Sequence, residues 1–290
     1  MIENKQVRSI IKGALCEDRV RYDITTHTLI PKNLKASARI IAKETGVVCA
    51  LSIAEFIFRQ LDKTLKFKAH FKDGQRIKQG SVLADISGKA GPILQAERTA
   101  LNFLSYLSGV ASYTNEFVSR VKPYKANILD TRKTTPNLRI LEKYAVKCGG
   151  GFNHRFDLGE QVLIKDNHLS LSRIAYFVSR QGTIKEIIEK TRKRIKNKRI
   201  KIEVEVNNIK EFNDALSGLP DIIMLDNFSL ADIKKAVALR GKHKTPQLEV
   251  SGGVKLANVK KIAACGVERI SIGALTHSVK SLDLSLEIIQ

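Results

Sequence analysis

Polar and charged residues stand at the ends of short apolar segments in the second half of the sequence, and these residues could do chemistry. Each closes or follows an apolar run typical of a buried strand: Asp130, Lys165, Glu205, Asp226, Ser251 and Gly273. The carboxyl ends of parallel strands meet at one edge of a sheet, and in α/β barrels that edge carries the active site. We therefore expect these positions to form part of one site.

Alternation within the strand IEVEV sharpens this expectation. If Ile202, Val204 and Val206 face the surrounding helices, then Glu203 and Glu205 face the barrel interior. An unpaired carboxylate is costly there, because it loses its hydration. Each of the two glutamates therefore needs a cation, a metal ion or a substrate hydroxyl as a partner.

The densest chemical signal lies in residues 130–168. This stretch carries four fixed cations and a histidine around a turn of three glycines: Arg132, Lys133, His154, Arg155 and Lys165, with Gly149, Gly150 and Gly151. Cations that converge from strand ends and a loop suit carboxylates and phosphates. Glycines let the backbone approach a ligand closely and otherwise reduce stability. We expect a deep anion-binding site here.

The elements that must position these residues form two groups along the chain. The first half has helical spacing in residues 3–17 and 53–61, and a long helix is predicted from about Ile93 to Val121. Its strand-like runs are 36–43, 46–50, 65–71 and 81–88. The second half alternates six short apolar strands with helices, which indicates βα units around a parallel sheet. A partial or seven-stranded α/β barrel is the preferred architecture, and an open doubly wound sheet is the alternative.

Composition and charge limit the class of protein. The chain has 290 residues, 43% of them hydrophobic, which excludes disordered and collagen-like classes. Its 50 Lys and Arg against 29 acidic residues give a formal charge of +21, which favours anionic partners. With no Trp and 6% aromatic residues, the base-stacking surface of a single-strand binder is thin. Small polyanionic substrates and nucleic acid both stay open at this point.

The cysteines and the chain's apolar runs indicate the compartment. Four cysteines stand far apart in the sequence, with no CxxC pair and no zinc-type Cys-His spacing. We expect them to be reduced, in a cytoplasmic protein. No secretion signal and no membrane segment is recognisable, because charges interrupt the first residues and no apolar run approaches about 18 residues.

Several motifs, taken in order and spacing, resemble the quinolinate phosphoribosyltransferase family, the decarboxylating nicotinate-nucleotide pyrophosphorylases. They are DTRKTTP, KCGGG followed by NHR, VLIKDNH, EVEV, IIMLDN, VSGGV and ISIGALTHS, with ERTALNFL at 97–104 and EDRVRYDITT at 17–26. Together they cover essentially the whole chain and are jointly specific. The resemblance implies an N-terminal α/β sandwich over residues 1–110 and a seven-stranded, incomplete barrel over residues 111–279. The C-terminal tail, residues 280–290, can return to the first domain.

The resemblance also implies an activity. A member of this family is a pentosyltransferase that joins quinolinate to 5-phosphoribosyl 1-diphosphate with Mg²⁺. It releases nicotinate mononucleotide, diphosphate and carbon dioxide, a step of de novo NAD synthesis. The family works as a homodimer or a larger oligomer, and neither nucleic acid nor membrane is an expected partner.

Carried onto this chain, the family pattern assigns site residues. The clamp for the two quinolinate carboxylates is Arg132, His154, Arg155 and Lys165, with Thr131 as a further substrate contact. Lys133 sits at the reacting end of the ribosyl donor, and Glu205 and Asp226 hold the ribose hydroxyls and Mg²⁺. The family pattern thus makes these last three residues the catalytic set.

Two further assignments concern the phosphate and the dimer. The 5-phosphate rests on backbone N–H groups in two turns that open into helices: Ser251, Gly252 and Gly253, and Ile272, Gly273 and Ala274. Arg98 reaches the quinolinate of the neighbouring subunit. Asn137 and Tyr22 stand where the family commonly has Gly, and Asn tolerates a positive φ better than most residues do.

Rival interpretations come from the same fold and from another class. A phosphoribosyltransferase-like paralogue encoded with molybdenum-uptake genes would share DTRK and the phosphate turns. A basic nucleic-acid-binding protein would use the run 185–201, which holds nine Lys or Arg against two acids. A solvated helix face is the preferred interpretation of that run. Cys148 is interpreted as a packing residue, because the reaction needs no covalent nucleophile.

Overall fold

The structure, a computed structural model, describes residues 2–176, 182–243 and 245–289. The chain forms two compact units. Unit 1 comprises Met1–Asn115, Lys133–Gly151 and Ala274–Gln290, and unit 2 comprises Glu116–Arg132 and Phe152–Gly273. None of the described helices is long and apolar enough to cross a membrane.

Unit 1 is built on an antiparallel sheet with the strand order β12-β1-β5-β3. The strands are β1 (Lys35–Ala42), β3 (Lys66–Ala69), β5 (Val82–Lys89) and β12 (Leu284–Ile289). β12 pairs with β1, so the C-terminal residues complete the sheet of the first half. A second small sheet pairs β2 (Gly46–Val47) with β4 (Arg76–Ile77).

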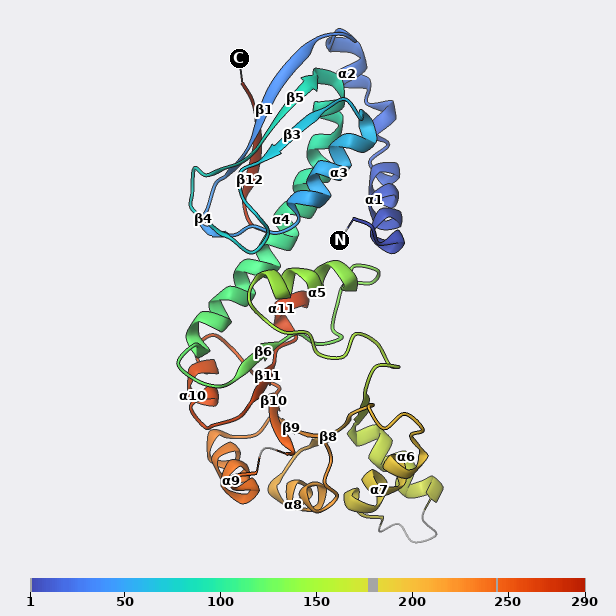
Figure 1. Cartoon of the computed structure of the whole chain (residues 1–290), viewed down its shortest axis with the longest axis vertical. Helices are drawn as coiled ribbons and strands as arrows, with labels where there is room; N and C mark the ends of the chain where they lie inside the picture. Colours follow the sequence, from blue (N-terminus) through green and yellow to red (C-terminus); the bar gives the residue numbers. More distant parts are fainter. Residues whose placement is uncertain (1, 177–181, 244, 290) are drawn as a thin grey trace. The chain divides into compact units, whose positions relative to one another are not determined.

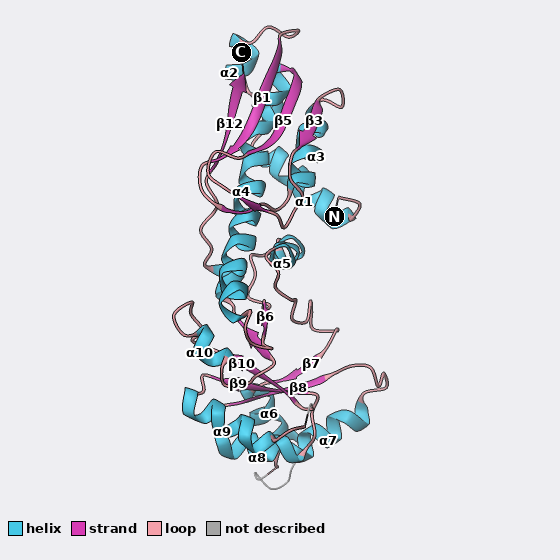
Figure 2. Ribbon diagram, turned by 60° about the vertical axis from the view of Figure 1, so that its left-hand side comes forward, coloured by secondary structure: helices cyan, strands magenta, loops and turns pink. Residues whose placement is uncertain are grey.

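Helices lie along one face of the larger sheet, as Figures 1 and 2 show for α3 and α4. The helical segments of unit 1 are α1 (Lys5–Glu17), η1 (Val20–Tyr22), α2 (Ile24–Leu29), α3 (Leu51–Leu61), α4 (Ala90–Val121), α5 (Arg139–Cys148) and α11 (Ala274–His277), with the last turns of α4 in unit 2. Ala38, Ile40 and Ala42 alternate along β1 and are fully buried. This period-two burial is the reason that the segment forms a half-buried strand.

Unit 2 is a parallel sheet of the strand order β6-β11-β10-β9-β8-β7. Its strands are β6 (Asn127–Leu129), β7 (Val162–Ile164), β8 (Ile202–Val206), β9 (Ile222–Asp226), β10 (Gln247–Ser251) and β11 (Arg269–Ser271). All adjacent pairs run in parallel. These are the six strands that the apolar runs predict.

A seventh position in the parallel sheet had no counterpart among the predicted strands. Phe152 forms a parallel bridge to Leu129 of β6: its N–H donates to Ile128 O (2.8 Å), and its carbonyl accepts from Asp130 N (3.1 Å). A single bridging residue offers no hydrophobic period, so a pattern search cannot find it. With this residue the sheet is the incomplete α/β barrel that the sequence predicts.

The helices of unit 2 begin at side chains that cap them. They are α6 (Asp166–Tyr176), α7 (Ile184–Arg194), α8 (Ile209–Ser217), α9 (Leu230–Arg240) and α10 (Val259–Ala263), of which α7, α8 and α9 lie on one side of the strands in Figure 2. Thr183 and Glu186 form a capping box at the start of α7. Asn208 and Ser229 accept backbone N–H groups at the starts of α8 and α9.

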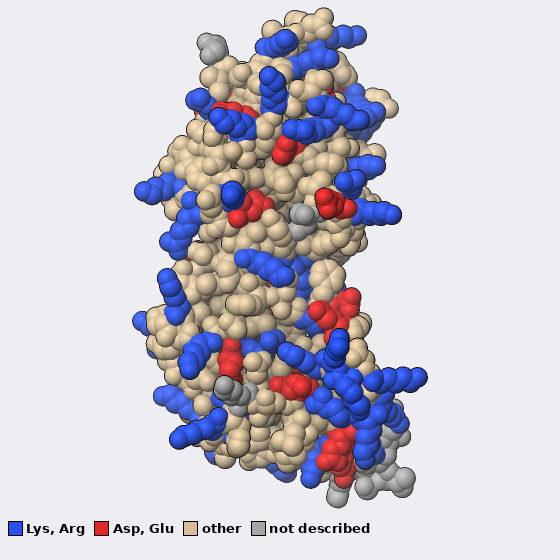
Figure 3. Space-filling model, viewed as in Figure 1, with Lys and Arg blue, Asp and Glu red and all other residues tan. Residues whose placement is uncertain are grey.

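The basic run 185–201 behaves as a solvated face. Ile184, Ile187 and Ile188 turn inward from α7, whereas the Lys and Arg side chains are exposed, except Arg192, which is half-buried in an ion pair with Asp221 (3.0 Å). Figure 3 shows Lys and Arg side chains over the whole visible face, most densely at its lower right, with fewer acidic side chains. This exposure is what a solvated helix face requires, and the absence of a nucleic-acid role stays a prediction.

Candidate active site

The carboxyl ends of the parallel strands gather the predicted polar residues of unit 2 at one edge. Asp226 and Ser251 are the last residues of β9 and β10 and lie directly opposite each other in the register. Glu205 is the next-to-last residue of β8, and Lys165 follows β7 directly. Because all the strands run in parallel, this edge is shared, as the sequence predicts.

Two guanidinium groups lie close together in unit 2. Burial lowers the pKa of Arg155 and the nearby positive charge of Arg132 lowers it further, whereas the charges of Glu203 and Asp157 raise it. The Arg155 side chain is held by a hydrogen bond from its Nη1 to Gln161 O (2.9 Å). Like charges held together disfavour each other, so a ligand with negative groups would relieve the repulsion. The pair has the chemistry of a carboxylate or phosphate clamp.

A buried charged cluster in unit 2 is formed by His154, Glu203, Glu249 and Arg269, and we call it the inner cluster. The Nε2 atom of His154 is 3.1 Å from Glu203 Oε2 and 3.3 Å from Glu249 Oε1. Arg269 Nε donates to Glu249 Oε2 at 2.6 Å. Both glutamates are fully buried. Two acids and two bases therefore neutralise one another away from water, although Glu249 Oε1 has no hydrogen bond from any residue that the structure describes.

The inner cluster also sets the protonation of its members. Burial lowers the pKa of His154, but its interactions with the two glutamates outweigh it and raise the pKa to about 9. Burial raises the pKa of Glu203, and the neighbouring Glu249 raises it further. Glu203 thus has the cationic partner that an inward carboxylate was expected to need.

Both ring nitrogens of His154 contact protein atoms. The Arg155 N–H donates to Nδ1 at 2.8 Å, so in this geometry the ring proton is on Nε2, which faces the glutamates. A second proton on Nδ1, which the raised pKa favours, would displace that contact. The His154 N–H donates to Asp130 Oδ1 at 2.9 Å. The role of His154 in the carboxylate clamp stays a prediction, since a ligand would have to replace one of these partners.

Two carboxylates face a lysine at the strand edge. Burial raises the pKa of Glu205, whereas the Lys165 ammonium lowers it and the Asp226 and Asp166 charges raise it. The Asp226 Oδ2 atom accepts a hydrogen bond from Asn227 Nδ2 (2.8 Å). The mutual repulsion of Glu205 and Asp226 suits a hard divalent cation, which commonly binds through one or two carboxylates plus substrate phosphates. These two residues therefore fit Mg²⁺, although its binding here stays a prediction.

A glycine turn closes the edge after β10. Gly252 and Gly253 have φ values of +81° and +60°. A Cβ atom on Gly252 would lie 2.3 Å from Asn227 Oδ1, so another side chain would displace the neighbouring loop. The expected helix does not follow at once: α10 begins only at Val259. Any phosphate at this turn would contact backbone N–H groups without the dipole of an adjoining helix, which corrects the prediction.

The second phosphate turn also differs from the prediction in one residue. The N–H of Ile272 donates to Leu129 O at 2.9 Å, because the β11–β6 ladder continues one residue beyond β11. This N–H is therefore committed to the sheet rather than to a ligand. Gly273 and Ala274, which follow it and lead into α11, remain the predicted donors of this turn.

Three predicted site residues belong to unit 1: Arg98, Lys133 and Ala274. Arg98 is exposed on α4 and lines a hollow of about 830 Å³ with Asn137 and Leu138. Lys133 is exposed, and its carbonyl accepts a hydrogen bond from Thr276 Oγ1 (2.6 Å). Asn137 has a φ of +67°, which confirms that this position needs a positive φ.

Supporting residues of the DTRKTTP loop escaped the sequence interpretation. Glu142 is fully buried within α5, and its carboxylate accepts Thr135 N (3.2 Å) and Tyr106 OH (2.5 Å). Burial and the Glu142 hydrogen bond raise the pKa of Tyr106 to about 12, so its hydroxyl stays a donor. A charged residue on the apolar face of a predicted helix is the signal that could have revealed Glu142.

Period two could likewise have revealed the rest of the inner cluster. In LEVS (248–251) and RISI (269–272) apolar residues alternate with polar ones that include Glu249 and Arg269, just as they alternate with Glu203 in IEVEV. The sequence interpretation applied this argument to β8 only.

The three glycines after α5 serve packing inside unit 1. A Cβ atom on Gly149 would lie 2.3 Å from Ala111 O, and one on Gly151 would lie 2.8 Å from Thr114 Cγ2. Gly150 has a φ of +87°. The structure therefore explains these glycines by the close approach of α4, instead of the expected approach to a ligand.

Comparison with known proteins agrees with this fold and these motifs. Residues 23–108 match the family model "Quinolinate phosphoribosyl transferase, N-terminal domain", and residues 110–287 match its C-terminal domain model. A protein of Methanocaldococcus jannaschii named "Probable nicotinate-nucleotide pyrophosphorylase" is 42% identical over 97% of this chain and 96% of its own length. A tobacco protein named "Quinolinate phosphoribosyltransferase 2b, mitochondrial", of the decarboxylating type, is 36% identical over 97% of this chain and 82% of its own length.

Solved structures give the same answer. The crystal structure of nicotinate-nucleotide pyrophosphorylase from Ehrlichia chaffeensis is 40% identical and covers 97% of this chain and 98% of its own, with a TM-score of 0.88. Both domain models together span most of the chain, and the identities extend over nearly its full length. The chain belongs to the quinolinate phosphoribosyl transferase family.

Proposed function

We propose that the chain transfers a phosphoribosyl group from 5-phosphoribosyl 1-diphosphate to quinolinate and removes one carboxylate. The products are nicotinate mononucleotide, diphosphate and carbon dioxide, so the enzyme is a decarboxylating pentosyltransferase of NAD synthesis. Family membership, shown over residues 23–108 and 110–287, supports the reaction class.

The closeness of Arg132 and Arg155 is the observation that carries the substrate assignment. Quinolinate has two adjacent carboxylates, and two guanidinium groups that repel each other match such a dianion. Lys165 adds a third cation at the same strand edge, beside Glu205. A monocarboxylate would leave part of this positive charge without a partner.

We assign the ribosyl donor to the carboxylates at the same strand edge. Glu205 and Asp226 would accept the ribose hydroxyls and hold Mg²⁺, which would neutralise the departing diphosphate. The turn at Ser251, Gly252 and Gly253 offers its backbone N–H groups to the 5-phosphate. Lys133 would face the leaving group.

The mechanism follows from where charge develops. Positive charge grows at the anomeric carbon as the diphosphate departs, and the pyridine nitrogen attacks from the opposite face. Glu205 and Asp226 favour the developing cation, while Lys133 favours the leaving anion. Orientation of two bound reactants can contribute roughly 7–11 kcal/mol toward lowering the barrier. No covalent bond to the protein forms.

Loss of carbon dioxide follows from the new bond. Once ribosylated, the ring nitrogen carries a positive charge, which stabilises the carbanion that remains when the neighbouring carboxylate leaves. The electron pair of the broken C–C bond stays on the ring carbon and takes up a proton. The arginine clamp holds the remaining carboxylate and so keeps the ring in place.

We propose that the protein works as a homodimer in which Arg98 of each subunit contributes to the partner's site. We place this homodimer in the cytoplasm. The four cysteines are free thiols in the structure, which suits a reducing compartment.

Inactive Arg98→Ala and Lys133→Ala variants should complement each other when co-expressed. Each mixed dimer would have one intact site, so activity should recover to about a quarter of wild type. No recovery, with mixed dimers verified by mass, would contradict the shared site.

A product assay tests the function. The purified chain, with 5-phosphoribosyl 1-diphosphate and Mg²⁺, is offered quinolinate, nicotinate and nicotinamide in parallel. We expect carbon dioxide and nicotinate mononucleotide from quinolinate, and rejection of nicotinate by up to about 10⁴-fold, because the clamp would be left unpaired. Equal rates on nicotinate and quinolinate would overturn the assignment.

A further inference from the structure

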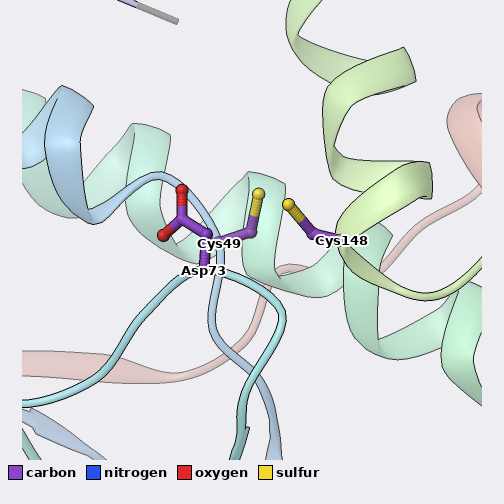
Figure 4. A group of neighbouring side chains, drawn as sticks. All are labelled: Cys49, Asp73 and Cys148. Carbon is purple, nitrogen blue, oxygen red and sulfur yellow. The ribbon is translucent and has the colours of Figure 1, made fainter.

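A group of three side chains in unit 1 lies outside the proposed reaction. Cys49, Asp73 and Cys148 each offer one atom, and these atoms all lie within 4.8 Å of one another. Figure 4 shows the two sulfur atoms pointing toward each other, with the Asp73 carboxylate beside Cys49. The residues come from three separate segments: the loop before α3, the loop before β4 and the last residue of α5. We call this group the thiol cluster.

The backbone around the thiol cluster is fixed. Ser108 Oγ accepts the Cys49 N–H (2.9 Å) and donates to the Cys49 carbonyl (3.2 Å). Gly74, with a φ of +88°, packs so closely that a Cβ atom would lie 3.2 Å from Cys148 O. The backbone of each cysteine is thus held in place, which favours a common ligand between their neighbouring sulfur atoms.

Asp73 is oriented by two hydrogen bonds. Its Oδ1 accepts the Leu51 N–H (3.0 Å), and its Oδ2 accepts Tyr144 OH (2.7 Å). An ionised carboxylate has about four acceptor sites, so each oxygen keeps capacity for another ligand. A hydroxyl donated to a carboxylate is the kind of outer contact that orients metal ligands. Capping of α3 explains the hydrogen bond from the Leu51 N–H to Asp73. It does not explain the hydrogen bond from Tyr144 or the closeness of the two sulfur atoms.

Charge in the thiol cluster is unbalanced. Asp73 forms no ion pair with any Lys, Arg or His among residues that the structure describes. A bound cation would supply a counter-charge for Asp73 beside the two thiols.

We propose that Cys49, Cys148 and Asp73 bind one Zn²⁺ ion, with water as the fourth ligand. Zn²⁺ takes sulfur and carboxylate ligands in a tetrahedron, with bonds of about 2.3 Å to sulfur and about 2.0–2.2 Å to oxygen. Such bonds require ligand atoms about 3.5–4 Å apart, which is within the spacing of the cluster. Each thiol that binds releases its proton to solvent. The ion would join three segments of unit 1 and so stabilise the end of α5.

Cobalt(II) is the probe for this site, because a thiolate-to-metal charge-transfer band reports sulfur ligation and ignores the carboxylates of unit 2. The full-length protein, reduced with a phosphine, should give this band and saturate at one equivalent of Co²⁺. Cys148→Ser should abolish the band, and Asp73→Asn should weaken binding. Cys265→Ser and Cys16→Ser are matched controls and should retain it. Circular dichroism verifies that each variant is folded.

Two further measurements distinguish metal binding by the thiol cluster from a purely structural role of its residues. Tyr144→Phe should keep the band but weaken Co²⁺ binding by about 10–100-fold, as loss of an outer contact does. Zn²⁺ should raise the melting temperature of the wild type and not that of Cys148→Ser. The proposal is overturned if the wild type shows no band, or if Cys148→Ser keeps it. A Cys49–Cys148 disulfide in protein purified without reductant would also overturn it, since the pair would then be a redox couple.

Discussion

Two glutamates on the same strand, Glu203 and Glu205, face the same side of the parallel sheet and have different surroundings. Glu203 is fully buried and contacts His154 and Gln161. Glu205, roughly 6.6 Å further along β8, is half-buried at the strand edge near Lys165 and Asp226. The inner residue has partners within the protein, whereas the outer residue is surrounded by charges that a ligand could complete.

The comparison teaches that depth along a barrel strand separates support from chemistry. The inner cluster joins β8, β10 and β11 through His154 and Arg269, so its charges are used in holding the strands. The outer layer keeps Glu205, Asp226 and Lys165 at the edge where the proposed substrates would bind. Substitutions in the two layers should therefore damage different properties.

The largest expected effect is on stability, from the inner cluster. Arg269→Met leaves the buried Glu249 without its 2.6 Å partner. Removal of one member of a buried ion pair costs about 3–5 kcal/mol. Denaturant unfolding should reveal this loss, with a smaller loss in turnover. Arg192→Met is the control: its partly exposed pair with Asp221 contributes about 1 kcal/mol or less. Equal effects of the two changes would count against the inner cluster as a support.

The next effect is on turnover, from the outer layer. Asp226→Asn keeps the shape of the side chain but removes the charge that the proposed mechanism places next to the developing cation. Steady-state kinetics should reveal a decrease of about 10²–10³-fold in kcat, while the free energy of unfolding stays unchanged. Asp221→Asn, at the opposite end of β9, should leave kcat as it is. A decrease in kcat for both variants would mean that location at the carboxyl edge of the sheet does not determine which of the two residues affects turnover.

The glycine turn should respond to substitution through donor binding. Gly252→Ala forces a Cβ against Asn227 at a φ of +81°, which costs of order 1–3 kcal/mol. We expect a higher KM for 5-phosphoribosyl 1-diphosphate as the turn shifts. Gly241→Ala, at a φ of +70° but with no atom within 4 Å, isolates the effect of φ on stability and should leave this KM unchanged. An unchanged KM in Gly252→Ala would remove the turn from the phosphate site.

The smallest effect is expected from substitutions in the basic run 185–201, which includes most of α7 and the segment that follows it. Lys193→Gln with Lys198→Gln should change the free energy of unfolding by no more than about 0.5 kcal/mol, because both side chains are exposed. Titration with labelled DNA at physiological salt should reveal only non-specific affinity, with a Kd of about 10⁻⁴–10⁻⁶ M. Tighter binding, lost in this double variant, would give the run a role beyond solvation.

Sequence pattern predicts those parts of the molecule in which one chemical rule dominates. The strands of unit 2 follow apolar runs, and their polar ends meet because the sheet is parallel. The strand-like run 46–50 shortens to β2, Gly46–Val47, because Cys49 and Ala50 turn into α3, with Ala50 at a φ of +81°. An alanine in that conformation depends on tertiary contacts, which local spacing cannot reveal.

The candidate site likewise contains residues that the sequence predicts and residues that it does not. Motif resemblance and strand ends predict Lys165, Glu205 and Asp226, because each is read from its own segment. Arg269 and Glu142 contribute through partners that are distant in the sequence, such as Glu249 and Tyr106. The commitment of the Ile272 N–H to Leu129 also depends on sheet register. Such pairings become visible only when the strands are placed side by side.

The most direct test of the two-layer account compares Glu203→Ala with Glu205→Ala on two axes, unfolding free energy and kcat. The account predicts that Glu203→Ala loses about 3–5 kcal/mol of stability, because His154 loses a buried partner. Glu205→Ala should stay within about 1 kcal/mol of wild type in stability and lose about 10²–10³-fold in kcat. The reverse pattern, with Glu205→Ala unstable and Glu203→Ala stable but inactive, would contradict the separation of support from chemistry along β8.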